Sequence, residues 1–316
     1  MTSRQNEKVF YGWKLSFLAA FGNFMIQGGA VYLMNAFIEP FSGLYGWSRG
    51  EIGTALGIGS FCGMAAAPFL ASLAMKVSLR VIMTLGALFG GVSLFLLGQF
   101  TSLTLFTLNF CVLWIAGQAC GGVIANALMS NWFIKYRGRA FGIVNFGMSF
   151  SGAILPFVAL ILIKLFSVQT ASAILGVFLL AILLPATWLF VRDTPESMGL
   201  HPDGIEPLDG GESVESTAET PPTIRELLRD PLVYRVAIPF TLAILASAGV
   251  VGQLKPRFSD LGFDDFTAMG FMCATAFFTA SGKYIWGWVC DKIPPLRAAK
   301  IFFIYCVGAF PLSVPP

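Results

Sequence analysis

The amino-acid sequence predicts an all-α integral membrane protein. Hydrophobic residues occupy 56% of its 316 positions and charged residues only 12%, about half of the roughly 25% that is usual in soluble proteins. Long apolar segments recur along the whole chain. A chain this apolar cannot cover itself with polar surface in water, whereas lipid removes that requirement.

The apolar segments predict eight complete spans and part of a ninth, because a bilayer core needs about 20 mostly apolar residues. The first segment is too long, and too polar at Asn23 and Gln27, to be a cleaved signal peptide. The ninth begins near residue 299 and is still apolar at Pro316, so we expect the chain to be incomplete at its C-terminal end. The eight complete segments lie near 12–37, 51–75, 81–100, 104–131, 140–163, 167–191, 233–254 and 266–290.

Residues 193–232 differ from the rest because they are polar, acidic and rich in Gly and Pro. This composition is typical of a solvated, largely disordered linker. It divides the chain into a six-helix bundle over 1–192, an acidic cytoplasmic linker over 193–232, and the start of a second bundle over 233–316. Most of the 20 Lys and Arg residues fall in loops on the side of the N-terminus, which predicts a cytoplasmic N-terminus in a multi-pass protein of the plasma membrane, the inner membrane in a bacterium.

Several classes of function are disfavoured. The net charge of +3 comes without any basic stripe, so no nucleic-acid partner is expected. The six cysteines lie in or beside apolar segments without a C-x-x-C pair, and the single histidine, His201, lies in the linker, so we expect no metal and no cofactor. No intramembrane cluster of carboxylates or histidines supports an enzyme.

A short pattern is repeated in the two parts of the chain. Gly287-Trp288-Val289-Cys290-Asp291-Lys292, followed by Arg297, has a counterpart in Ala71-Ser72-Leu73-Ala74-Met75-Lys76, followed by Arg80. A repeat that includes six helices is typical of a transporter built from two related halves.

The Gly287-x-x-x-Asp291-Lys292 pattern resembles the loop signature of the major facilitator superfamily. The stretch from Asn131 to Gly142 and the sequence Phe10-Tyr11-Gly12-Trp13 are similar to its monocarboxylate transporter and oxalate–formate antiporter branch. The resemblance implies two six-helix halves, the second incomplete here, and secondary transport by alternating access, as a symporter or an antiporter.

Asp291 is expected to take part in a cytoplasmic latch that forms ion pairs in one conformation and loses them in another. Its neighbours Lys292 and Arg297 would be its partners, and an ordinary charged loop is the alternative. Met75 stands where the family has a carboxylate, so a latch in the first half is weakened or absent. The other candidate gating residues are the basic residues of the loops on the same side: Lys76, Arg80, Arg137 and Arg139.

Lys283 is the main candidate for substrate binding. It lies eight residues before Asp291, about 12 Å along a helix. A lysine at that depth costs about 2.5–3.5 kcal/mol on insertion scales, so we expect it to face a cavity and bind an anion, unless it snorkels to the interface. The resemblance implies the same, because a helix 8 arginine of monocarboxylate transporters matches this position. The acidic partner of that arginine corresponds to Thr279 here, so the family's proton-coupling scheme does not carry over.

Weaker candidates for lining the transport path are Asn23, Gln27, Gln118, Asn145 and Ser149. Each of them could instead bond a neighbouring helix. Gly142, Gly147 and Gly152 recur at five-residue intervals in one segment, which indicates close helix approach.

The sequence thus predicts a transporter of a small organic anion, a monocarboxylate or a dicarboxylate-like molecule. Its partners would be that solute, a proton or a counter-anion, and membrane lipid. The alternatives are an exporter of drugs or amphiphiles, a carboxylate sensor that does not transport, and an inactive fragment. We expect the 316 residues alone not to transport.

Overall fold

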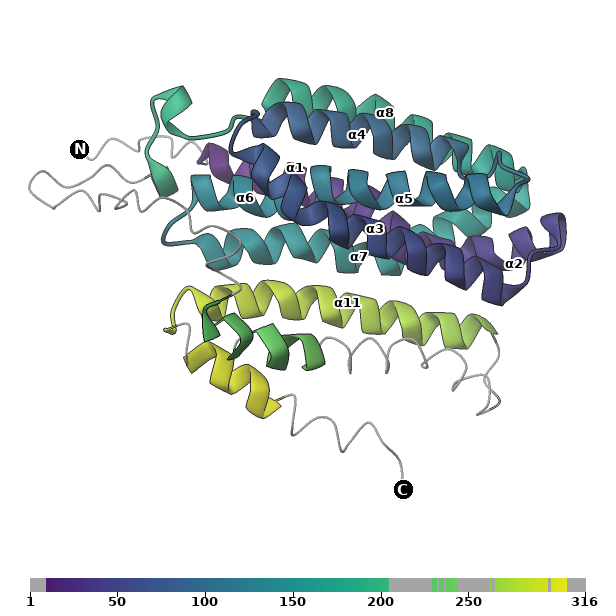
Figure 1. Cartoon of the computed structure of the whole chain (residues 1–316). Helices are drawn as coiled ribbons and strands as arrows, with labels where there is room; N and C mark the ends of the chain where they lie inside the picture. Colours follow the sequence, from purple (N-terminus) through teal and green to yellow (C-terminus); the bar gives the residue numbers. More distant parts are fainter. Residues whose placement is uncertain are drawn as a thin grey trace, which may run out of the picture. The chain divides into compact units, whose positions relative to one another are not determined.

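The computed structural model describes residues 10–204, 229–231, 233–235, 237–243, 262, 265–294 and 297–305 (Figure 1). Helices and turns, and no β-strand, make up these described residues. Six helical stretches among them are long and apolar enough to cross a membrane, which confirms the first six predicted segments: Tyr11–Tyr45, Arg49–Ala74, Leu79–Leu96, Leu103–Trp132, Arg137–Leu165 and Val168–Phe190.

Two of the six stretches are interrupted. The first consists of α1 (Tyr11–Gly22), two π-helical turns η1 (Asn23–Gln27) and η2 (Gly29–Leu33), and α2 (Met34–Tyr45). The fourth consists of α5 (Leu103–Cys120) and α6 (Val123–Trp132). The uninterrupted ones are α3 (Arg49–Ala74), α4 (Leu79–Leu96), α7 (Arg137–Leu165) and α8 (Val168–Phe190).

The later segments are described in part. The helix α11 (Asp265–Cys290) matches the segment expected over 266–290. The segment expected over 233–254 is helical where it is described, at 233–235 and 237–243, and the segment expected from 299 is helical over 297–305. The rest of both segments, and linker residues 205–228, lie outside the described residues.

The chain forms two compact units. The first contains residues 1–204 together with 273–292, and the second contains 205–272 together with 293–316. The end of α11 therefore belongs with the N-terminal helices. Within the second unit, the ring of Phe240 packs against Phe302 and Phe303, with centroids 5.5 and 5.0 Å apart.

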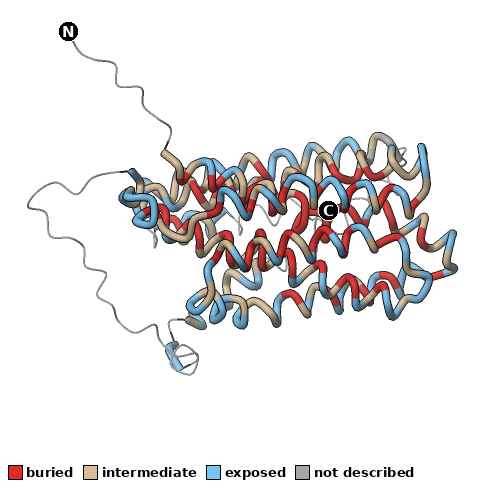
Figure 2. Tube along the Cα trace, turned by 90° about the horizontal axis from the view of Figure 1, so that it is seen from above, coloured by how far each residue is buried: buried red, intermediate tan, exposed pale blue. Residues whose placement is uncertain are grey.

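The interior of the first unit has two apolar clusters. One surrounds Phe37, Phe41, Phe106 and Phe110, toward the end of the bundle where α2 ends. Figure 2 shows that buried residues recur along the inner sides of the helices. On the outer sides large apolar side chains are exposed, Phe61 by 71% and Phe69 by 73%, which suits a surface that meets lipid.

The second cluster lies at the opposite end, where α1 begins, and includes Leu15, Leu128, Trp132, Phe133 and Val191. We call this the α1 end of the bundle. Because α8 also ends there, the chain that follows it crosses the ends of several helices.

The chain from 191 to 204, which we call the strap, is folded. It contains the short 3-10 turns η3 (Glu196–Met198) and η4 (Pro202–Gly204), and Leu200 packs against the second apolar cluster. The first part of the segment expected to be a solvated linker is therefore ordered against the bundle. Its polar contacts take part in the candidate site.

Candidate functional site

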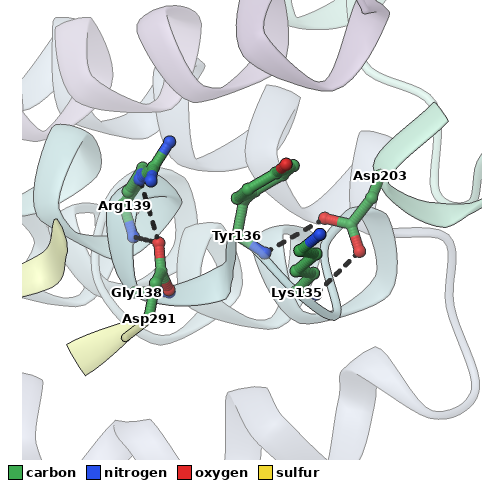
Figure 3. A network of polar contacts seen from close by, with 6 residues as sticks. All are labelled: Lys135, Tyr136, Gly138, Arg139, Asp203 and Asp291. Atoms are coloured by element: carbon green, nitrogen blue, oxygen red, sulfur yellow. Dashed lines mark hydrogen bonds and ion pairs between the residues drawn. The ribbon is translucent and has the colours of Figure 1, made fainter. Parts of the chain in front are cut away.

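The start of α7 is held by a carboxylate from α11. The backbone N–H groups of Gly138 and Arg139 donate to Asp291, at N–O distances of 2.6 and 3.1 Å, and the Arg139 Nε lies 3.4 Å from the same carboxylate (Figure 3). The first N–H groups of a helix have no partner within it. Tyr136, at the N-cap, makes no side-chain cap, so Asp291 supplies the missing acceptor and places a negative charge at the positive helix end.

Two glycines allow this contact. A Cβ atom on Gly138 would overlap the carbonyl oxygen of Gly287, and one on Gly287 would overlap the carbonyl oxygen of Gly138. Farther along, a Cβ atom on Gly142 would lie 3.0 Å from the carbonyl oxygen of Lys283. Side chains larger than hydrogen would push the two backbones apart, so these positions set how closely α7 and α11 approach.

The contact continues along both helices. The thiol of Cys273 lies 3.6 Å from the carbonyl oxygen of Ala153, near the middle of α7. The middle of α7 thus meets the beginning of the 273–290 part of α11, and this part of α11 runs antiparallel to the first half of α7 (Figure 1).

The two charged side chains of this network differ in how far they are buried. The Asp291 side chain is only 6% exposed, whereas that of Arg139 is 29% exposed. The guanidinium also lies over the Tyr136 ring, 5.0 Å from its centroid. The sequence placed Asp291 against Lys292 and Arg297; the ion pair in the structure is with Arg139, and the Lys292 ammonium lies 3.8 Å from the centroid of the Trp288 ring.

The other candidate gating residues have separate places. Arg137 donates to the carbonyl oxygens of Phe133 and Ser130, at the end of α6. Arg80 donates from Nε to the carbonyl oxygen of Val191, on the strap. Lys76 is exposed and lines a pocket of about 430 Å³ beside Phe69 and Leu73 of α3. Arg297 lies in the second unit, where its backbone N–H donates to Pro294.

A second carboxylate holds the turn before α7. The backbone N–H groups of Ile134, Lys135 and Tyr136 all donate to Asp203 of the strap, at 2.9, 2.7 and 3.2 Å. Figure 3 shows Asp203 beside Lys135 and Tyr136. Asp203 has φ 60° and ψ 0°, in the left-handed region that Asp and Asn tolerate better than most residues. The sequence analysis did not assign this residue a role; the only local signal was the turn-forming sequence Pro202-Asp203-Gly204.

The strap is fixed elsewhere by a similar contact. The carboxylate of Asp193 accepts the backbone N–H of Arg80, near the start of α4, at 3.1 Å. Its backbone carbonyl accepts from the Asn131 side chain at 3.1 Å, and the indole of Trp132 donates to the carbonyl oxygen of Arg192 at 2.8 Å. The strap thus connects the ends of α4 and α6 to the turn that begins α7.

Two motifs that carried the family resemblance meet at the same end. The ring of Phe10 packs 5.8 Å from that of Trp132 and 5.7 Å from that of Phe133. Trp13 packs 4.7 Å from Phe133. The sequence Phe10-Tyr11-Gly12-Trp13 and the stretch from Asn131 are therefore two sides of one aromatic cluster beneath the turn.

Lys283 lies on α11 between the Asp291 network and the middle of the helix. Its backbone touches Gly142, and its side chain is half-buried. No hydrogen bond or ion pair involves its ammonium group among the residues that the structure describes.

Asn23 and Gln27 lie between helices. The amide nitrogen of Asn23 donates to the carbonyl oxygen of Val144 at 3.0 Å, and its side chain fits against Gly121. Gln27 fits against Gly117, and its buried oxygen accepts no hydrogen bond within the described part of the chain. Asn23 therefore bonds a neighbouring helix, while Gln27 retains an unused acceptor.

The remaining candidates for lining the transport path contact different neighbours. Gln118 lies against Gly122, at the end of α5. Asn145 donates back to Phe141 of its own helix at 2.9 Å. The buried Ser149 hydroxyl faces the side chain of Tyr32. The glycines of α7 serve different neighbours, since Gly142 faces α11, Gly147 faces Ala20 of α1, and Gly152 faces Tyr32.

A comparison with protein families identifies one match. The family model of the Major Facilitator Superfamily matches residues 15–316. No curated protein sequence matches the chain.

Proposed function

Because the chain belongs to the major facilitator superfamily, whose members are secondary membrane transporters, we propose that it carries a small organic anion across the membrane by alternating access. Lys283 is the observation that carries this proposal. A lysine within a membrane-spanning helix is costly and usually faces the interior of a bundle or a water-filled path.

The surroundings of Lys283 favour an anionic ligand. Its ammonium is half-buried without a carboxylate partner among the described residues, so its charge is available. Gln27, whose buried side-chain oxygen accepts no hydrogen bond among the described residues, is the best supported of the other candidates for lining the path. An ammonium binds a carboxylate as a point charge, without the bidentate geometry of arginine. The resemblance to monocarboxylate transporters supports the same class of substrate, with a proton or a counter-anion as the coupled species.

The Asp291 network is the proposed gate on the side of the N-terminus, which the excess of basic residues in its loops indicates is the cytoplasmic side. In the gate, Asp291 binds the start of α7 only while α7 and α11 lie against each other. Separation of the two helices would break these bonds and open a path to Lys283. Arg139 adds an ion pair to the closed form.

The test is uptake of a labelled carboxylate panel by the full-length gene product in liposomes. Replacing Lys283 by Ala should abolish saturable uptake, and replacing it by Arg should retain part of it. Lys164→Ala is the matched control, because Lys164 is an exposed lysine in the last turn of α7. Uptake that is indifferent to Lys283 would remove the anion assignment and favour an exporter of drugs or amphiphiles.

A further inference from the structure

We propose that Asp203 is a positioning residue of the cytoplasmic gate, through which the strap controls how the start of α7 is presented to Asp291. This inference rests on the proposed function, because it assumes that the Asp291 contact is a gate. Asp203 does not touch α11 or any substrate path; it acts through the turn that precedes α7.

The backbone donors of the turn are divided between two carboxylates. The N–H groups of Ile134, Lys135 and Tyr136 donate to Asp203, and those of Gly138 and Arg139, directly after them, donate to Asp291. An anion that gathers several successive N–H groups fixes the conformation of the segment that carries them. Asp203 thus holds the three residues before α7 in the conformation from which the next two N–H groups point at Asp291.

The strap has fixed supports on both sides of this contact. Before it, Asp193 and Arg192 bond to Arg80 and Trp132. At it, Gly204 lies against the Phe10 ring, where an added Cβ atom would lie 2.8 Å from Cδ2. Asp203 is therefore attached, through the strap, to a part of the bundle that does not include α11.

Asp203 lies close to the end of the first compact unit, since residue 205 begins the second unit. Release of Asp203 would loosen the turn and weaken the Asp291 contact without any change in α11.

The backbone conformation of Asp203 decides which substitutions can test its role. Because Asp203 is in the left-handed region, Asp203→Asn and Asp203→Gly keep that conformation accessible while they remove the charge or the whole side chain. Glu196→Gln is the matched control, since it removes an exposed carboxylate of the same strap that makes no hydrogen bond or ion pair within the described part of the chain. Thermal unfolding of each variant checks that the bundle remains folded.

Hydrogen–deuterium exchange of the full-length protein in lipid nanodiscs tests the proposal at single amides. Asp203→Asn and Asp203→Gly should accelerate exchange at Ile134, Lys135 and Tyr136 by about tenfold, as expected for loss of charge-assisted hydrogen bonds. They should also accelerate exchange at Gly138 and Arg139, to which Asp203 does not bond, by about threefold or more. Glu196→Gln should leave all five amides unchanged.

Two results would overturn the proposal. If only the amides at 134–136 exchange faster, Asp203 is a local anchor and not a positioning residue. If none of the five exchanges faster, the contact does not order the turn. A separate variant, Asp291→Asn, tests the gate itself. If this variant leaves both uptake and the solvent accessibility of the α7–α11 contact unchanged, the contact is not a gate, whatever the exchange rates in the Asp203 variants are.

Discussion

Replacing Asp291 by Asn should open the proposed cytoplasmic gate. The substitution keeps the size and one acceptor oxygen of the side chain but removes its charge. In the closed contact the carboxylate accepts two backbone N–H groups of α7 and is 6% exposed, so little water competes for it. The variant therefore isolates the attraction between a buried anion and a helix start.

The size of the effect can be estimated from the contacts. Gly138 and Arg139 donate to different oxygens of Asp291, and Asn has one acceptor oxygen, so one bond becomes neutral and the other is lost. Hydrogen bonds to a charged acceptor contribute about 1.5–3 kcal/mol, against about 0.5–1.5 kcal/mol for neutral ones, so the two changes together cost about 2.5–4 kcal/mol, which includes the attraction to the helix end. A shift of this size toward the open form corresponds to a change of about 60-fold to 700-fold in the open-to-closed ratio.

The thiol of Cys290 provides the assay, because it is free, half-buried and adjacent to Asp291. Its alkylation by a water-soluble maleimide in inside-out vesicles, measured by peptide mass spectrometry, should accelerate by at least about tenfold in Asp291→Asn. Arg139→Gln should accelerate it by less than about fivefold, because a partly exposed pair at 3.4 Å contributes about 1 kcal/mol or less. Alkylation within a factor of about two of the parent rate in Asp291→Asn would refute the assignment of this contact as a gate.

Two further substitutions separate helix contact from fold stability. Gly287→Val should also speed alkylation of Cys290 and abolish uptake, because the new side chain meets the Gly138 backbone. Gly282→Val is its control, since no described atom lies within 4 Å of a Cβ atom at that position. Equal effects of the two substitutions would contradict the argument that α7 and α11 need close contact at Gly287. Asn109→Leu should lower the free energy of unfolding by about 1–3 kcal/mol, because it leaves the buried carbonyl of Ser93, now bonded at 2.9 Å, without that donor. Thermal unfolding followed by intrinsic tryptophan fluorescence measures this loss, and an unchanged midpoint would contradict it.

The spans were predictable from the sequence because spanning a bilayer is a requirement on composition and length. The six stretches from Tyr11–Tyr45 to Val168–Phe190 needed only a count of apolar residues. The interruptions inside them were not predicted. The π-helical turns at Asn23–Gln27 and Gly29–Leu33 depend on how α1 packs against its neighbours, which local composition does not record.

The sequence predicted which charged residues take part in the network at the α1 end, but not which of them form the ion pair. Asp291 and Arg139 were both candidates on charge and motif, yet their contact joins positions far apart in the chain and depends on which helices become neighbours. The glycine spacing in α7 predicted close approach, while only the fold distributes Gly142 to α11 and Gly147 to α1. The role of Asp203 was not predicted, because the acidic, glycine-rich segment around it has the composition of a solvated linker.

The strap has a practical consequence for dividing this protein. Hydropathy alone would end the N-terminal bundle at residue 192, just after the apolar part of α8. A cut there would remove Asp193 and Asp203 and leave the backbone donors of Arg80, Ile134, Lys135 and Tyr136 without the acceptors they have now. Any split, fusion or exchange of halves should therefore be made after Gly204, which keeps these acceptors in one piece with the N-terminal helices.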